Sequence, residues 1–431
     1  MQMNRIEALP IIKDLRKGKA PKIHANDLFV GQKAWFDNAL SGIEETAECK
    51  SFEVRFIRAR YGGGKTHFLR CLEAEAKRLN WVTAHVELKH KIVEMDNFNT
   101  VVRAVTGGID LPDGQIGFYS LLEKALVIIA SRYGYDPDRP MTMQIYEKAR
   151  SGASIFCREN YLSFNFSIAL MGAMQAFLDK DTIRLQQIAN WFCGSDSIKI
   201  DPASQMKTPG CSNTHTTAVT LKTLSTGEAD QLMRFIAVLV LAAGFKGLFI
   251  GLDEIELIAG MNDKRRRENS FQTLRSLIDQ NDPYRQPPST CLFLAATPHM
   301  FEDQAMFPKY KALQDRIEEL PVLGSIQKIN YSAPVINLDK TEPGTLELVQ
   351  MSEKILDIFK IAYGIVPIYI EKRRDELIGA IIKGGYVIAR PRLFCRCMID
   401  LLEGNLSSDL QKDLPKISKQ IEEERKKEVE L

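Results

Sequence analysis

Residues 59–66, "ARYGGGKT", carry the strongest indication of the fold in this sequence. This segment follows "SFEVRFIRAR" (51–60), whose alternating apolar residues are typical of a strand. It also opens "KTHFLRCLEAEAKRLN" (65–80), which consists of helix formers with apolar residues three and four positions apart. A glycine-rich turn that leaves a strand and enters a helix through Lys-Thr has the context of a phosphate-binding loop.

The residue types of this loop suit a phosphate group. Glycines 62–64 let successive backbone N–H groups turn toward one point, and the helix N-terminus adds its positive end. Lys65 can reach the β- and γ-phosphates, and the Thr66 hydroxyl can bind Mg²⁺. The predicted nucleotide-binding residues of the loop are Tyr61, Gly62, Gly63, Gly64, Lys65, Thr66 and His67.

One residue departs from the pattern G-x-x-x-x-G-K-[ST]. Ala59 stands where the first glycine is expected. The replacement matters only if this position needs a positive φ or leaves no room for a Cβ atom. A chance glycine-rich turn is the alternative interpretation of the loop.

A second motif lies in "KGLFIGLDEIE" (246–256), a short apolar run typical of a central parallel strand. Ligands of open α/β sheets bind at the carboxyl ends of the strands, where Asp253 and Glu254 stand. We expect Asp253 to hold Mg²⁺ and Glu254 to activate water as a general base. A strand that simply ends in a charged solvent turn is the alternative.

A catalytic glutamate beside the aspartate marks the additional-strand (ASCE) class, which has another strand between the loop strand and the aspartate strand.

"STCLFLAATPHMF" (289–301) fits that additional strand. It ends at Thr297, which is expected to contact the γ-phosphate or hold the attacking water; a threonine that caps the turn before Pro298 is the alternative. "KINYSAPVINLD" (328–339) is predicted to be an edge strand, because Pro334 would break a central ladder.

Strands that alternate with helices predict a doubly wound α/β core with a parallel sheet. Three helices are expected from about residue 345, before the charged tail "KQIEEERKKEVEL". The expected organisation is an N-terminal segment and first half of the ATPase core (1–109), a mostly helical insertion (110–225), the second half of the core (226–340) and a C-terminal helical lid (341–431).

Composition narrows the class of protein. The 431 residues include 57 basic and 55 acidic side chains, so nucleic-acid or membrane binding would need local patches. No apolar run reaches the ~18–20 residues that span a bilayer, and the N-terminus lacks signal-peptide features. The eight cysteines are scattered apart from Cys395 and Cys397, which favours reduced thiols over a zinc site. We expect a cytoplasmic protein.

Arginines that could complete a phosphoryl-transfer site follow the core motifs. "KYKALQDRIEEL" carries Arg316 on a helix, where a finger acting on a neighbouring subunit often lies. Arg390 and Arg392 begin a lid helix, from which an arginine can contact the nucleotide of its own chain. The run Arg265–Arg267 is either a solvated helix face or a patch that contacts nucleic-acid phosphates.

Several segments, in this order, resemble one family: "IIKDLRKGKAP", "DLFVGQKAWFDNAL", "FIRARYGGGKTHFLR", "GLFIGLDEIELI", "LRSLID", "LAATPHMFED", "YKALQDRI" and, later, "RPRLF". They look like the ATP-binding proteins of BREX bacteriophage-defence systems, of the BrxD type. That family is part of the AAA+ P-loop ATPases, in a branch similar to origin-recognition and archaeal ATPases. The resemblance covers the chain from its N-terminus to about residue 320.

The resemblance implies further roles. Val30, with its neighbours Phe29 and Gly31, would pack beside the adenine. Arg392 matches the second-sensor arginine and Arg316 the finger. Members usually have glycine where Ala59 stands. The family implies work linked to DNA, with a helicase or other defence proteins as partners.

The expected activity is therefore hydrolysis of ATP, bound with Mg²⁺, by a homo-oligomer. It is expected to be slow and to be stimulated by assembly or DNA. Two alternatives stay open: an ATP-gated scaffold or switch with little hydrolysis, and a DNA-binding module, against which the near-neutral charge weighs.

Overall fold

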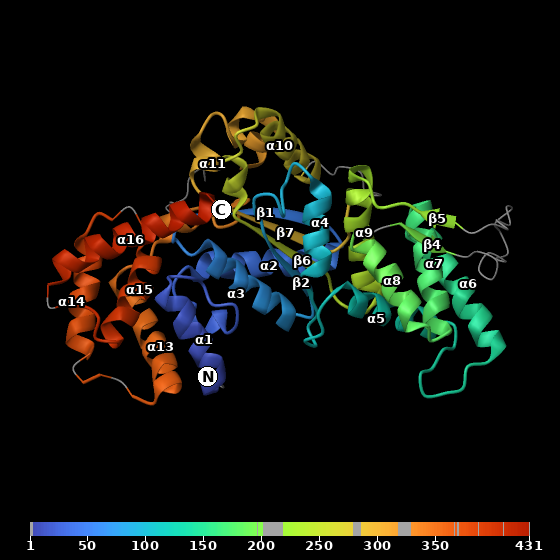
Figure 1. The fold of residues 1–431 in the computed structure, drawn as a ribbon, viewed down its shortest axis with the longest axis horizontal. Coiled ribbons are helices and arrows are strands. Elements are labelled where there is room, and N and C mark those ends of the chain that lie inside the picture. The colour runs from blue at the N-terminus through green and yellow to red at the C-terminus, as the bar shows by residue number, and fades with distance from the viewer. Residues whose placement is uncertain are drawn as a thin grey trace.

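A central sheet carries helices on both faces, with a group of helices at each end (Figure 1). The computed structural model describes residues 3–195, 197–200, 219–278, 286–317, 329–365, 367–368, 370–386, 388–407 and 409–430. This architecture confirms the predicted α/β fold of a P-loop ATPase.

In the described part of the chain, the sheet has six strands in the order β3-β2-β6-β7-β1-β8. They are β1 (Phe52–Arg58), β2 (Val82–Glu87), β3 (Ile109–Asp110), β6 (Leu248–Asp253), β7 (Thr290–Ala296) and β8 (Val335–Asn337). All neighbouring strands are parallel except β3, which is antiparallel to β2. The predicted additional strand is confirmed, because β7 lies between β1 and β6. The edge position of β8 is confirmed too, and Pro334 contributes only its carbonyl, which accepts from the Phe56 N–H at 2.9 Å.

Alternate residues of each strand enter different cores, because strand side chains point to opposite faces. Phe56 and Ile250 join the core on one side, whereas their chain neighbours Ile57 and Phe249 join the core on the other. α2 (Lys33–Cys49) and α3 (Lys65–Arg78) cover the second face, and α4 (Phe98–Gly107) and α9 (Ala229–Ala242) cover the first. The helix α10 (Lys264–Ile278) and several short elements complete this part of the chain: η1 (Ala25–Leu28), η2 (Thr226–Glu228), η3 (Ile255–Ile258), α11 (His299–Glu302), η4 (Phe307–Lys309), α12 (Lys311–Ile317) and η5 (Leu338–Thr341).

The region predicted to be a helical insertion extends the core of the first face. Its helices are α5 (Phe118–Ser131), α6 (Met143–Glu159), α7 (Phe164–Leu178) and α8 (Thr182–Phe192). Phe166 of α7 stacks on Phe235 of α9 with ring centroids 5.5 Å apart, so the two groups of helices share one hydrophobic cluster. Two short antiparallel strands, β4 (Ile198–Ile200) and β5 (Val219–Leu221), were not predicted, because three residues give too little pattern.

Among its described residues, the C-terminal region predicted to be a lid has four helices, not the three expected: α13 (Thr345–Tyr363), α14 (Ile370–Lys383), α15 (Arg390–Leu402) and α16 (Leu410–Glu430). The fourth, α16, includes the charged tail, and it packs through buried Leu414 and Ile421. α1 (Arg5–Arg16) also belongs to this core: Ile12 is fully buried in it. The first helix of the chain thus completes the lid (Figure 1).

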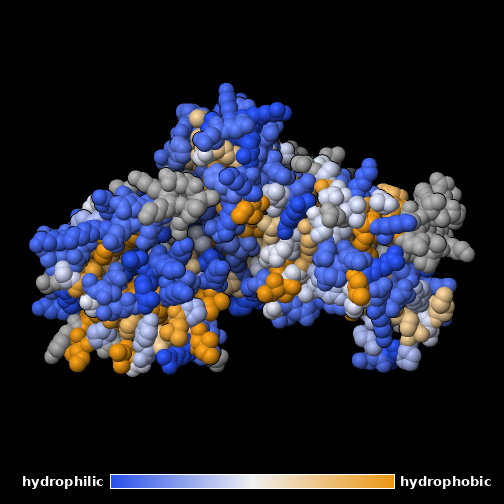
Figure 2. Space-filling view, viewed as in Figure 1, coloured by the Kyte–Doolittle hydropathy of each residue, from blue (hydrophilic) through white to orange (hydrophobic). Residues whose placement is uncertain are grey.

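The face shown in Figure 2 is mostly hydrophilic, and apolar side chains gather at the lower end of the lid and α1. Ile6 of α1 and Leu346 of α13 are more than two-thirds exposed. Among the described residues, no helix is both long and apolar enough to cross a membrane.

Candidate functional site

The glycine-rich loop joins β1 to α3. Gly62 and Gly64 have φ values of 79° and 93°, which favour glycine. A Cβ atom on Gly63 would lie 2.8 Å from the Ala59 methyl and 2.9 Å from the Arg60 carbonyl oxygen. The loop therefore needs all three glycines, and its backbone has the tight form that a phosphate cradle requires.

Ala59 fits the loop without strain. Its φ is not positive, and its side chain is fully buried. Its N–H points to the Ala296 carbonyl oxygen at 3.4 Å, so the start of the loop is tied to the end of β7. Neither condition that would demand glycine at this position is met.

Thr66 and Asp253 come together from opposite halves of the chain. The Thr66 hydroxyl donates a 2.6 Å hydrogen bond to Asp253 Oδ2, across 187 residues. Asp253 is the last residue of β6 and is only 2% exposed. A hydroxyl and a carboxylate are the hard oxygen ligands that Mg²⁺ prefers, so this pair fits the cation. Among the described residues, no group of three or more His, Cys, Asp or Glu side chains forms a separate metal site.

Glu254 follows in a left-handed conformation, with φ 60° and ψ 39°. Burial, and then the charges of Glu256 and Asp253, raise the pKa of Glu254 to about 8, although Lys65 opposes the shift. A carboxylate of this kind accepts a proton readily near neutral pH, which suits a general base.

Lys65 is buried beside a residue that the sequence motif did not single out. Its Nζ lies 3.3 Å from Glu256 Oε1. Burial would lower the pKa of Lys65, but the charges of Glu256, Glu254 and Asp253 raise it above its ordinary value. The only sequence signal for Glu256 is a third acidic residue three positions after Asp253.

Thr297 directly follows β7 and is 7% exposed. Because β7 lies between β1 and β6, Thr297 is placed at the same edge of the sheet as the loop and Asp253. Its carbonyl accepts from the Met300 N–H at 3.0 Å in the turn into α11, so both of its predicted roles stay compatible with its position.

The start of α15 binds the loop. The Arg392 N–H donates to the Gly62 carbonyl at 3.3 Å, and the Ala389 N–H to the Tyr61 carbonyl at 3.2 Å. The Arg392 guanidinium lies over the Tyr61 ring, 4.4 Å from its centroid. The predicted lid arginine is therefore next to the loop, stacked on one of its residues.

A carboxylate that the sequence did not reveal joins the loop to the lid. Glu342 Oε2 lies 3.1 Å from the Arg60 guanidinium, and Glu342 Oε1 accepts from the Arg390 N–H at 3.0 Å. The Arg60 N–H also donates to Asp339 at 3.0 Å. Nothing in the sequence signals these pairs, because Glu342 lies in a connection without a motif.

The segment predicted to lie beside the adenine packs against the lid. Val30 is partly buried against the lid core, and the Lys354 ammonium donates to the Phe29 carbonyl at 2.8 Å. The Phe29 ring stacks on His67, with centroids 6.5 Å apart. Burial, followed by the charges of Arg70 and Lys354, lowers the pKa of His67 to about 4.

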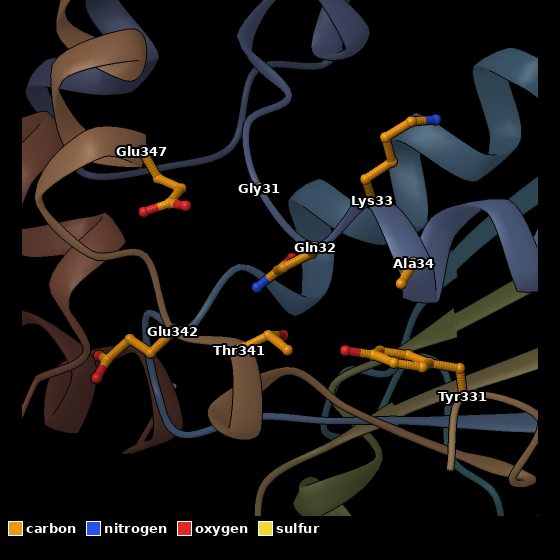
Figure 3. A pocket seen from close by; sticks show the side chains of 8 residues that line it. All are labelled: Gly31, Gln32, Lys33, Ala34, Tyr331, Thr341, Glu342 and Glu347. Atoms are coloured by element: carbon orange, nitrogen blue, oxygen red, sulfur yellow. The ribbon is translucent and has the colours of Figure 1, made fainter. Parts of the chain in front are cut away.

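A cavity of about 270 Å³ lies beside this segment (Figure 3). It is lined by Gly31, Gln32, Lys33, Ala34, Tyr331, Thr341, Glu342 and Glu347. Figure 3 shows the Gln32 amide and the Tyr331 hydroxyl directed toward Thr341, from the start of α2 and from the segment before β8. The cavity thus lies between the segment predicted to pack beside the adenine and Glu342, the residue that connects the loop to the lid.

The remaining predicted arginines are Arg316 and the basic run Arg265–Arg267. Arg316 lies in α12, and its side chain is outside the described part of the structure. In the basic run, Arg266 is paired with Glu94 and Asp96, at 2.5 and 2.7 Å. Arg265 is exposed. The run is therefore not a uniform basic patch.

Comparison with protein families places most of the chain in one family. The family model described as "BREX system ATP-binding protein BrxC/D" matches residues 3–410. No curated protein and no solved structure matches the chain. The loop, the paired Thr66 and Asp253 and the strand order agree with an ATP-binding protein of this kind. The chain belongs to the BrxC/BrxD family, the ATP-binding proteins of BREX anti-phage defence systems.

Proposed function

We propose that the protein binds ATP with Mg²⁺ at the loop and hydrolyses it slowly. The contact between Thr66 and Asp253 is the observation that carries this proposal. The contact brings the hydroxyl of Thr66, which follows Lys65, next to the carboxylate of Asp253, which ends β6. Two side chains that bind the same cation must lie this close together. Loop glycines 62–64 would give their N–H groups to the phosphates.

Each polar group has a distinct task in this mechanism. Lys65 attracts the β- and γ-phosphate oxygens, and Glu254 takes the proton of the attacking water. Mg²⁺, bound by Thr66 and Asp253, would supply positive charge to the phosphates. Thr297 orients the γ-phosphate or the water. The raised pKa of Glu254 suits this residue to receive a proton near neutral pH.

The lid would respond to the nucleotide. Arg392, Ala389 and Glu342 all contact the loop that would hold the phosphates. A ligand that reshapes this loop therefore changes the contacts of α15. These contacts also support the alternative of an ATP-gated switch, in which lid movement is the output and hydrolysis is incidental.

We further propose that the working form is a cytoplasmic homo-oligomer of the BrxD type, in which Arg316 reaches the site of a neighbouring subunit. The exposed apolar side chains at the lid end support a protein partner. DNA, and a helicase or other defence proteins, are the proposed further partners. The chain would divide into core halves 1–109 and 226–340, an insertion 110–225 and a lid 341–431.

Multiple-turnover phosphate release, measured with and without duplex DNA, separates these functions. Slow release that DNA accelerates several-fold supports an ATPase that works on DNA. Tight ATP binding with less than one turnover under both conditions supports the switch. No ATP binding under either condition contradicts the proposed function.

A further inference from the structure

Lys65 has a buried counter-ion inside the protein. Glu256 Oε1 lies 3.3 Å from Lys65 Nζ, and the two side chains are only 13% and 6% exposed. The second oxygen of this carboxylate, Oε2, is buried and has no hydrogen-bond partner among the described residues. Glu256 therefore points one charged oxygen at the lysine and leaves the other unsatisfied.

The same ammonium is required by the proposed phosphate site. A carboxylate and a phosphate oxygen carry like charge and compete for the same N–H donors. We propose that Glu256 occupies the phosphate position at Lys65 when no nucleotide is bound, and that its displacement sets the affinity for nucleotide. This inference rests on the proposed ATP site, and it adds a residue that determines how tightly the site binds.

The local backbone explains how Glu256 comes to this position. Glu254 turns the chain through a left-handed conformation into η3, the 3₁₀ turn. Ile255 and Ile258 are fully buried and anchor this turn, so the glutamate between them projects toward the loop. A nucleotide must therefore move the Glu256 side chain rather than the turn.

Glu256 would weaken nucleotide binding in two ways. It stabilises the empty site, because a buried ammonium without a counter-ion is costly. It also leaves a negative charge close to the phosphates after they bind. Both effects predict that nucleotide binds more tightly when the charge of Glu256 is removed. This holds even though the Glu256 carboxylate is itself a buried part of the site.

The test compares the dissociation constant of Mg·ATP for the wild-type protein and for Glu256→Gln, by calorimetry on the full chain. The substitution should tighten binding about tenfold. The matched control is Glu87→Gln, which removes a charge that also acts on Glu254 but is paired with Lys89 instead of Lys65. It should change the constant less than twofold.

A second test uses Glu256→Asp, whose shorter side chain keeps the negative charge but moves it away from Lys65. The quantity measured is the increase in the melting temperature of this variant when Mg·ATP is added. This shift should exceed that of the wild type. Equal or weaker binding by Glu256→Gln, or equal tightening by Glu87→Gln, would overturn the role of Glu256 while leaving the ATP site intact. A wild-type protein that binds no nucleotide would instead overturn the proposed function.

Discussion

The Thr66 hydroxyl donates a 2.6 Å hydrogen bond to the Asp253 carboxylate, although 187 residues separate the two side chains. The contact follows from two element boundaries: α3 begins at Lys65, and β6 ends at Asp253. Two oxygens of this kind at the carboxyl edge of a parallel sheet fit the proposed site for a cation and a phosphate.

Ala59 should have little effect on nucleotide binding. Its methyl group is fully buried, and its backbone does not need glycine. Ala59→Gly is expected to lower the free energy of unfolding by about 1 kcal/mol, through lost burial and added chain entropy. The dissociation constant of ATP should change less than threefold.

Gly63→Ala, by contrast, places a Cβ atom 2.8 Å from the Ala59 methyl and should abolish binding of ATP. Thermal melts and ATP titrations of both variants check this, and a tenfold gain in turnover by Ala59→Gly would show that the methyl group hinders the site.

The link between the loop and the lid should contribute to affinity. Glu342→Gln removes the charge that Arg60 and Arg390 share. Because these pairs are partly exposed, we expect ATP binding to weaken only about threefold to tenfold. Glu403→Gln is the control, since it breaks the pair that Glu403 forms with Arg16 at the far end of α15. Titration with a fluorescent ATP analogue compares the two variants, and equal weakening in both would show a general effect on the lid.

His85 should make stability depend on pH. Burial lowers its pKa, but the hydrogen bond and charge of Glu73, with the charge of Asp253, raise the pKa above its ordinary value of 6.5. A raised pKa means that this stabilisation is complete below about pH 6.5 and is lost as the pH rises through the folded-state pKa. Melting temperatures between pH 6 and 8.5 should therefore fall less in His85→Gln than in the wild type. The exposed His299→Gln is the control and should follow the wild-type curve. A wild-type slope in His85→Gln would contradict this assignment.

The role of Arg316 depends on whether neighbouring subunits assemble around the site. If Arg316 acts on a neighbouring subunit, Arg316→Ala should lose most phosphate release. Mixing it with Glu254→Gln, which keeps Arg316, should restore part of the activity, because mixed interfaces then combine one intact arginine with one intact base. Phosphate release across a series of mixing ratios checks this. No restoration at any ratio would argue against action between subunits.

The sequence predicted the elements that a local pattern defines. β1 has alternating apolar residues, whereas β6 and β7 are continuous apolar runs. The acidic pair after β6 predicted that β7 would lie between the other two strands. Glu256 and Glu342 escaped prediction because their roles depend on contacts with Lys65 and Arg60, which no spacing in the sequence encodes. Packing of α1 into the lid escaped prediction for the same reason, since α1 ends at Arg16 and the first lid helix begins only at Thr345.

The proposed ATPase activity depends most directly on Glu254. Glu254→Gln keeps the shape of the side chain and the contacts of Thr66 and Lys65, but it cannot take a proton from water. The decisive measurement is the fraction of protein-bound ATP that becomes ADP during an incubation with Mg²⁺, for the wild type and for this variant. We predict that both proteins bind ATP, that the wild type converts it to ADP, and that the variant retains it uncleaved. Conversion by the variant at the wild-type rate, or no ATP bound to either protein, would contradict the account.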